Sequence, residues 1–228
     1  MKILVVDVGG THIKILATGH KKRLEISSGP KMTPVKMVAA VRKATVGWKY
    51  DAVSIGYPGP VVHGRPIMEP RHLGTGWMAF NFSKAFGRPT KIVNDAAMQA
   101  LGSYQGGRML FLGLGTGLGS AMIVENVLEP MELAHLPYKK GKSYEYYVGL
   151  GGLKRLGKKK WRRQVNEVVR RLKAALQAEY VVLGGGNAKL LKKLPYGVRL
   201  GNNSHAFQGG YRLWSKLYCG TSRKRFVH

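Results

Sequence analysis

Residues 5–16 read VVDVGGTHIKIL, and residues 111–124 read FLGLGTGLGSAMIV. Each stretch consists of an apolar run, a glycine-rich turn that contains a threonine, and a second apolar run. This pattern predicts a β-hairpin with a glycine turn in each place. Because the same unit occurs twice at a wide separation, the sequence predicts two related lobes.

Short β-rich runs alternate with helical stretches along the rest of the chain. Thr33 and Pro34 are typical of a helix start, as capping residue and first helical residue. The expected strands are 2–6, 13–18, 51–57, 91–93, 109–112, 120–124 and 180–183, and the expected helices are 34–48, 96–104, 143–156, 158–178 and 187–193. This alternation predicts an α/β fold. Residues 204–228 carry no pattern that assigns them to an element.

Both glycine turns are candidate phosphate sites. Residues 113–119 (GLGTGLG) do not complete the GxGxxG motif of dinucleotide-binding folds, and no GxxxxGK[ST] motif occurs in the chain. Bare glycine N–H groups and a threonine hydroxyl can instead converge on an anion. A single such turn is more often only a tight hairpin turn, but two matched copies favour phosphate binding. The candidate residues are Gly9, Gly10, Thr11 and Lys14 in the first turn, and Gly115, Thr116 and Gly117 in the second.

The chain has only three aspartates, and two of them lie beside these features. Asp7 adjoins the first glycine turn, where a carboxylate can hold Mg²⁺ against phosphate oxygens. Asp95 follows an expected strand and begins an expected helix, so a helix N-cap is an equally good interpretation of that residue. Asp51 is better explained as the start of a strand.

The charge balance points to a polyanionic partner. The chain has 38 Lys and Arg against 11 Asp and Glu, a formal net charge of +27, which is far more than solubility requires. Residues 139–163 contain ten of these cations and one acid, Glu145, although a solvated helix face would also explain such a run. The lone Cys219 excludes an internal disulfide and a cysteine-rich zinc site, and it is typical of a cytoplasmic protein. We expect no signal peptide and no membrane-spanning segment.

Five motifs together resemble those of ROK sugar kinases, which belong to the hexokinase, Hsp70 and actin superfamily. They are DVGGTHIK (7–14), VNDA (93–96), LGLGTGLGSAM (112–122), ELAH (132–135) and VVLGGGN (181–187). The resemblance implies two ribonuclease-H-like lobes around a cleft. We expect residues 1–95 to form the smaller lobe and residues 96–228 the larger one, with the C-terminal segment returning to the first lobe. The resemblance also implies a homodimer.

The resemblance implies a role for each matching residue. Asp95 would be the general base that takes the proton from the 6-hydroxyl of the sugar, and Asp7 would hold Mg²⁺. Sugar contacts would come from Asn94, Glu132, His135, Gly59 and, as a weaker candidate, Glu145. The donor would also contact Gly184, Gly185, Gly186 and Asn187. Ala134 and Asn81 depart from the family pattern, and we assign no catalytic role to Asn81.

The expected activity is phosphorylation of glucose or another hexose, with polyphosphate and also ATP as donors. The zinc-site cysteines of many relatives are absent, and residues 139–161 look like the zinc-free polyphosphate glucokinases, so we expect no zinc. Lys158, Lys159, Lys160, Arg162 and Arg163 would form a polyphosphate track. One rival is a strictly ATP-dependent hexokinase. A nucleic-acid-binding repressor on the same scaffold is disfavoured, because no helix-turn-helix fits before Asp7.

Overall fold

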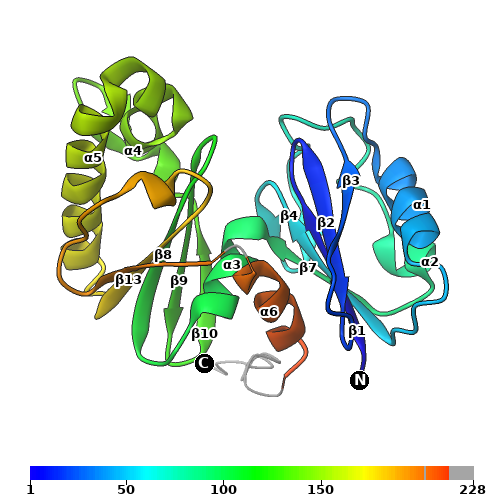
Figure 1. Cartoon of the computed structure of the whole chain (residues 1–228). Helices are drawn as coiled ribbons and strands as arrows, with labels where there is room; N and C mark the ends of the chain where they lie inside the picture. The colour runs from blue at the N-terminus through cyan, green and yellow to red at the C-terminus, as the bar shows by residue number, and fades with distance from the viewer. Residues whose placement is uncertain (203, 216–228) are drawn as a thin grey trace, which may run out of the picture.

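The computed structural model describes residues 1–202 and 204–215 of the chain. Within these residues the chain forms two five-stranded sheets, each with helices packed against it, and the predicted α/β class with two lobes is confirmed. We call the half built on the first sheet the first lobe and the half built on the second sheet the second lobe. Figure 1 shows a helical layer on the outside of each lobe and a pair of helices between the two sheets.

The first sheet has the strand order β3-β2-β1-β4-β7. Its strands are β1 (Ile3–Val8), β2 (His12–Ala17), β3 (Leu24–Ser27), β4 (Ala52–Tyr57) and β7 (Thr90–Asn94). The pairs β1–β2 and β2–β3 are antiparallel, whereas β1–β4 and β4–β7 are parallel. A small ribbon of β5 (Val61–Val62) and β6 (Arg65–Pro66) follows β4. The central strands are almost entirely buried, which agrees with their continuous apolar sequence.

The second sheet repeats this plan. Its order is β10-β9-β8-β13-β14, with strands β8 (Arg108–Leu114), β9 (Leu118–Val124), β10 (Val127–Met131), β13 (Tyr180–Gly184) and β14 (Val198–Leu200). Again the first three strands pair antiparallel and the last two join in parallel. The predicted hairpin repeat is therefore a repeat of the whole sheet. Strands β11 (Pro137–Lys139) and β12 (Lys142–Ser143) form a separate hairpin.

Helices α1 (Pro34–Ala44) and α2 (Phe82–Phe86) belong to the first lobe. The hydroxyl of Thr33 accepts the Lys36 N–H, so Thr33 caps α1 as predicted. Asn81, to which we assigned no catalytic role, caps α2 by accepting the Lys84 N–H at 2.9 Å. Helix α1 ends at residue 44 rather than 48, because Thr45 closes it with bonds to the Val41 carbonyl.

Helices α3 (Asp95–Ser103) and α6 (His205–Arg212) pack closely between the two sheets. Two glycines make the close crossing possible. A Cβ at Gly102 would collide with the His205 carbonyl, and a Cβ at Gly209 would collide with the Met98 carbonyl. Helix α6 also contacts β1 and β4 of the first sheet. We propose the boundary between the lobes at the junction of β7 and α3, with α6 reaching back to the first lobe.

The long basic stretch folds differently from the prediction. Instead of one helix over 143–156, the chain forms α4 (Tyr144–Val148), an extended Gly149, and α5 (Leu150–Ala175). The expected break near residue 157 is a kink at Gly157, with φ 70° and ψ 160°, inside α5. The expected helix 187–193 is wrong. Only a single 3₁₀ turn, η2 (Ala188–Leu190), forms there, after which Leu191 is extended; Arg162 donates to the Leu190 carbonyl at 2.6 Å.

Helix α5 buries one face against the second sheet, and Trp161 is fully buried there. The Trp161 indole N–H donates to the Val148 carbonyl at 2.8 Å and so ties α5 to α4. Of the cations around Trp161, Lys158, Lys159, Lys160 and Arg163 are exposed, whereas Arg162 is partly buried. Among the helices of the described residues, none has both the length and the apolar character needed to cross a bilayer. Cys219 lies outside the described residues.

Candidate functional site

Asp95 lies where the two lobes join, as the first residue of α3. The alternative interpretation of Asp95 as a helix N-cap is not what the structure shows, because Asn94 fills that position. The Asn94 Oδ1 accepts the N–H groups of Ala96 at 2.9 Å and Ala97 at 3.2 Å. The Asp95 carboxylate accepts the adjacent Ala96 N–H at 2.7 Å, and its own backbone N–H is a second hydrogen-bonding partner.

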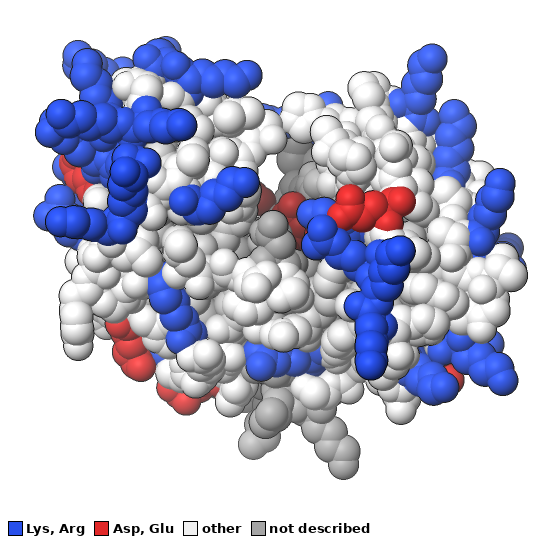
Figure 2. All heavy atoms as spheres, viewed as in Figure 1, with Lys and Arg blue, Asp and Glu red and all other residues white. Residues whose placement is uncertain are grey.

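The electrostatic setting of Asp95 suits a base. Its pKa is raised to about 7, first because the carboxyl group is shielded from bulk water and next because the Asp7 carboxylate lies nearby. Glu132 of the second lobe raises the same pKa more weakly. A carboxylate with a pKa near neutrality accepts a proton more readily than an ordinary aspartate. Acidic side chains are visible deep in the hollow between the lobes (Figure 2).

Asp7 lies within β1, which extends beyond the predicted strand 2–6 up to the first glycine turn. It pairs across the sheet with Lys14 on one side and Gly56 on the other. Burial raises the pKa of Asp7, and the Lys14 ammonium partly opposes that rise. In the described part of the chain, neither Asp7 nor Asp95 forms an ion pair.

An oxygen ligand with unbalanced negative charge fits Mg²⁺, which is bound by one or two carboxylates together with substrate phosphates. No group of three or more His, Cys, Asp or Glu side chains that could hold a metal occurs within residues 1–202 and 204–215. Asp7 therefore fits as a protein ligand to a metal that the donor phosphates also bind. The absence of zinc stays a prediction.

The first glycine turn is held from outside by Ser28. The Ser28 hydroxyl donates to the Gly9 carbonyl at 2.7 Å, and its N–H donates to the Thr11 carbonyl at 2.9 Å. The N–H groups of Gly10 and Thr11 have no acceptor among the described residues. A Cβ at Gly10 would lie 3.0 Å from the Cβ of His72, so this histidine packs directly on the turn. The turn thus presents two free N–H donors.

The second glycine turn spans residues 115–117, because β8 and β9 extend further than predicted. The N–H groups of Thr116 and Gly117 likewise have no acceptor in the described chain. Glu145, predicted to contact sugar, lies against this turn and accepts the Leu118 N–H at 3.1 Å. The first residue of α5, Leu150, donates its N–H to the Thr116 carbonyl.

The third glycine segment, residues 184–187, lies against the second turn. Asn187 donates its backbone N–H to the Leu114 carbonyl at 2.9 Å and its side-chain amide to the Gly115 carbonyl at 3.0 Å. The structure therefore brings together residues 115–117 and 184–187, and the start of α5 borders them.

Glu132 precedes the 3₁₀ turn η1 (Leu133–His135) of the second lobe, and His135 is the last residue of that turn. Ser120 fixes this turn, since its hydroxyl accepts the Leu133 N–H and donates to the Met131 carbonyl. Partial burial raises the pKa of Glu132, and the nearby His135 opposes the rise. Ala134 is buried and does not have a positive φ, so the alanine at this position needs no special backbone geometry.

Gly59 lies close to the catalytic candidate through Asn94, whose side-chain amide donates to the Gly59 carbonyl at 3.0 Å. Both polar ends of the Asn94 side chain are therefore engaged within the protein.

Ser28, Ser120, Arg71 and His72 were not predicted. Single serines and an isolated Arg-His pair in a loop carry no spacing signal, and their roles depend on contacts that form only in the fold. Arg71 acts electrostatically on Glu132 of the other lobe.

The predicted polyphosphate residues lie on the exposed side of α5, away from Asp95. Lys and Arg side chains gather over that part of the second lobe in Figure 2. Lys158, Lys159, Lys160 and Arg163 are exposed, and Arg162 is partly buried against η2. The one acid of α5, Glu167, is already bound to Lys139 at 2.6 Å and to Arg171 at 2.9 Å.

Comparison with known proteins places this geometry in context. The family model described as "ROK family" matches residues 3–129. Polyphosphate glucokinase of Mycobacterium tuberculosis is 27% identical over 82% of this chain and 78% of its own length. Glucokinase of Pyrobaculum calidifontis is 29% identical over 56% of this chain but only 45% of its own length. The solved structure of an inorganic polyphosphate/ATP-glucomannokinase from Arthrobacter has a TM-score of 0.77 at 22% identity, covering 92% of this chain and 96% of that one.

The family model covers more than half of the chain, and the glucomannokinase has the same fold over almost its whole length. The motifs that carried the resemblance coincide with the residues that the structure gathers at the lobe junction. The chain belongs to the ROK family.

Proposed function

We propose that this protein transfers a phosphoryl group to the 6-hydroxyl of glucose or a closely related hexose, with polyphosphate as donor and ATP as an alternative donor. The observation that carries the proposal is Asp95, which lies near the Asp7 carboxylate and has a pKa of about 7. It lies at the junction of two lobes, each of which presents a glycine turn with unpaired N–H groups.

In the proposed reaction Asp95 accepts the proton of the sugar hydroxyl as that oxygen attacks the terminal phosphorus of the donor. The bond between that phosphorus and its bridging oxygen breaks, and the shortened donor leaves with the electron pair. Phosphoryl transfer passes through a loose transition state, so positioning and charge compensation supply most of the catalysis. The free N–H groups of Gly10, Thr11, Thr116 and Gly117 are donors suited to the phosphoryl oxygens.

Asp7 would hold the Mg²⁺ ion, which when bound offsets the charge of the donor phosphates. Lys14, its neighbour across β1 and β2, moderates the charge of this carboxylate in the free protein. Asp7 also raises the pKa of Asp95, which makes the Asp95 carboxylate a stronger base.

On the sugar side, Glu132 and His135 would contact hydroxyl groups from the second lobe. Asn94 and Gly59, which are bound to each other, would shape the first-lobe side of the sugar site. Glu145 is better placed to fix the second glycine turn, and we retain it as a sugar contact only for a rearranged, sugar-bound state.

Polyphosphate is favoured as donor by charge. A net charge of +27 and the exposed cations of α5 match a long linear polyanion better than a single nucleotide. Two of the similar proteins are named for polyphosphate, and one of these also for ATP. Asn187 and residues 184–186 border the same turn and would contact either donor.

The test is a coupled assay in nucleotide-free buffer that crosses glucose, mannose and N-acetylhexosamines with polyphosphate and ATP. We expect glucose 6-phosphate with polyphosphate. Product with ATP alone would identify a strictly ATP-dependent hexokinase. Absence of any sugar phosphate with every pair would contradict the proposed function.

A further inference from the structure

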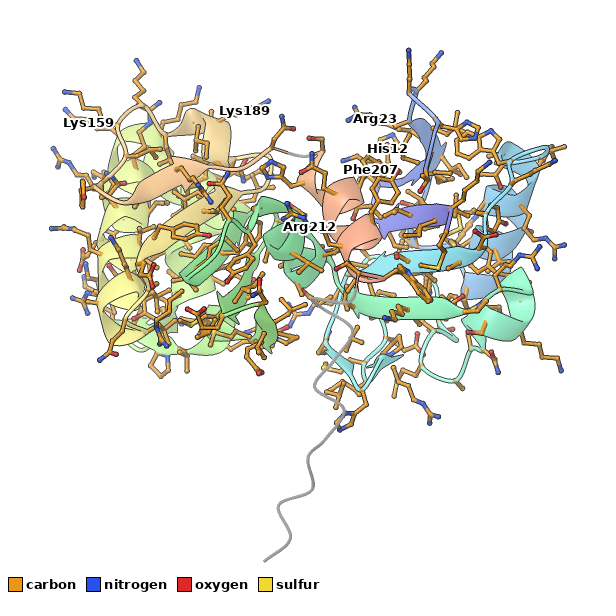
Figure 3. The ribbon with its side chains drawn as sticks, turned by 90° about the horizontal axis from the view of Figure 1, so that it is seen from below. His12, Arg23, Lys159, Lys189, Phe207 and Arg212 are labelled. Carbon is orange, nitrogen blue, oxygen red and sulfur yellow. The ribbon has the colours of Figure 1, made fainter. Side chains whose placement is uncertain are left out.

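A second group of cations lies beside the basic run of α5. The segment after Asn187 carries Lys189, Lys192 and Lys193, all exposed. It does not form the predicted helix, so its lysines follow an irregular path along the surface. Figure 3 shows Lys159 of α5 and Lys189 of this segment on the same side of the second lobe.

The two groups are fixed relative to each other. The Arg162 guanidinium of α5 donates to the Leu190 carbonyl at 2.6 Å, in the middle of the lysine segment. Leu191 and Ala188 are buried in the core under α5, which anchors the segment from below. The spacing between the two rows of cations is therefore set by the fold.

The two segments that carry the rows, α5 and residues 187–193, both begin at the second glycine turn. Asn187 binds the carbonyls of Leu114 and Gly115 at one side of the turn. Leu150 binds the Thr116 carbonyl at the other side. A polyanion whose end occupied this turn would lie with one row of cations on each side.

Neither row contains an acid. Residues 187–193 contain no Asp or Glu, and neither do residues 150–163. The acid beside them is Glu145 at the glycine turn, whose carboxylate accepts the Leu118 N–H, and a polyanion bound along the two rows would release its counterions.

We propose that Lys189, Lys192 and Lys193 form the second wall of a channel for long-chain polyphosphate, opposite Lys158, Lys159, Lys160, Arg162 and Arg163. This inference rests on the proposed function for its ligand. The six steps from Asn187 to Lys193 span at most roughly 20 Å. A tripolyphosphate that fills the glycine turns is shorter than this upper limit, so we expect it to contact fewer of these lysines than a long chain does.

The experiment compares a wall variant, Lys189→Ala/Lys192→Ala/Lys193→Ala, with a control variant, Lys43→Ala/Lys49→Ala/Lys84→Ala. The control lysines are exposed on the first lobe, and their removal changes the net charge by the same amount. Binding of long-chain polyphosphate and of tripolyphosphate is measured by calorimetry without sugar, over a range of salt concentrations.

We expect the wall variant to weaken long-chain binding by about tenfold, with less than about twofold change for tripolyphosphate. The slope of log Kd against log salt should fall by about two, at roughly 0.7 per lost contact. The control variant should leave both unchanged within about twofold. Equal weakening in the two variants, or no weakening in the wall variant, would overturn the channel.

The charge reversal Lys189→Glu gives an independent check if the triple variant is poorly folded. It should weaken long-chain binding more than Lys43→Glu does, and equal effects would contradict the proposal. Because no sugar is present, these measurements are separate from the proposed function. A protein that bound polyphosphate along this surface but phosphorylated no sugar would contradict that function and leave the channel intact.

Discussion

At the scale of single residues, Asp95 depends on the residue before it. Asn94 supplies the helix cap by accepting the N–H groups of Ala96 and Ala97, so the Asp95 carboxylate is not the group that caps α3. The sequence contains both residues but does not show which one caps α3. That choice is settled by backbone geometry, since Asn94 has the non-helical conformation of a cap and Asp95 is the first helical residue.

The pKa of Asp95 predicts the pH dependence of the reaction. The base acts only when ionised, so kcat/KM should fall about tenfold per pH unit as the pH drops below about 7. This is measured from initial rates with saturating donor between pH 5 and 9. An acid limb near the ordinary aspartate value would show that another group is the base.

The same pKa predicts a stability effect. The folded state holds the Asp95 proton up to about pH 7, whereas the unfolded chain releases it near 3.8, so folding stability is lost as the pH rises through this window. Asp95→Asn removes this cost. We expect the variant to be more stable than the wild type at pH 8, on the order of 1 kcal/mol or more, and equally stable near pH 4. Urea denaturation at both pH values measures this, and a less stable variant at pH 8 would contradict it.

Asp7 and Asp95 are predicted to interact directly. Asp7→Asn removes a nearby negative charge and should lower the pKa of Asp95. The chain has only three aspartates, so ¹³C labelling of aspartate gives three carboxyl resonances that can be titrated by NMR. The Asp95 resonance is assigned by its loss in Asp95→Asn. An unchanged Asp95 titration in Asp7→Asn would show that the two carboxyl groups are not coupled.

At the scale of elements, the two glycine hairpins were predictable because their signals are local. Apolar runs and glycines lie next to each other in the sequence, and the hairpins form as predicted, with longer strands. The helix break at Gly149 and the short turn η2 were missed. The contacts at these places join residues far apart in the sequence: Arg162 donates to the Leu190 carbonyl, and Leu150 donates to the Thr116 carbonyl. Helix α6 was not predicted, because its glycines have a role only where α6 packs closely against α3.

The crossing of α3 and α6 gives a test at this scale. Gly102→Ala or Gly209→Ala would push a methyl group into a backbone carbonyl of the other helix. We expect each to lower the free energy of unfolding by about 1–3 kcal/mol, as for other overpacked sites. Gly151→Ala is the matched control, since nothing lies within 4 Å of its Cβ position in α5, and it should be neutral or stabilising. Thermal denaturation compares the three, and equal effects would argue against a tight crossing.

At the scale of the whole molecule, two copies of one sheet plan face a common junction, and α3 and α6 lie between them. The sequence predicted the lobes and the residues at their junction, because the motifs lie at strand ends that the topology brings together. It did not predict how α6 connects both lobes. Lys91 of β7 binds the Leu213 carbonyl at 2.7 Å, and Arg212 binds the Leu101 and Tyr104 carbonyls at the end of α3. These contacts join residues more than a hundred positions apart.

The most direct test of the account is to identify the product made by the wild type and by Asp95→Asn. Each protein is incubated with glucose, Mg²⁺ and polyphosphate, and the sugar phosphate is assigned by ³¹P–¹H NMR. We predict glucose 6-phosphate from the wild type and a rate at least roughly 10²-fold lower from Asp95→Asn, which should still bind glucose in calorimetry. Near-normal turnover by a folded Asp95→Asn variant, or phosphate at another sugar position, would contradict the central claim.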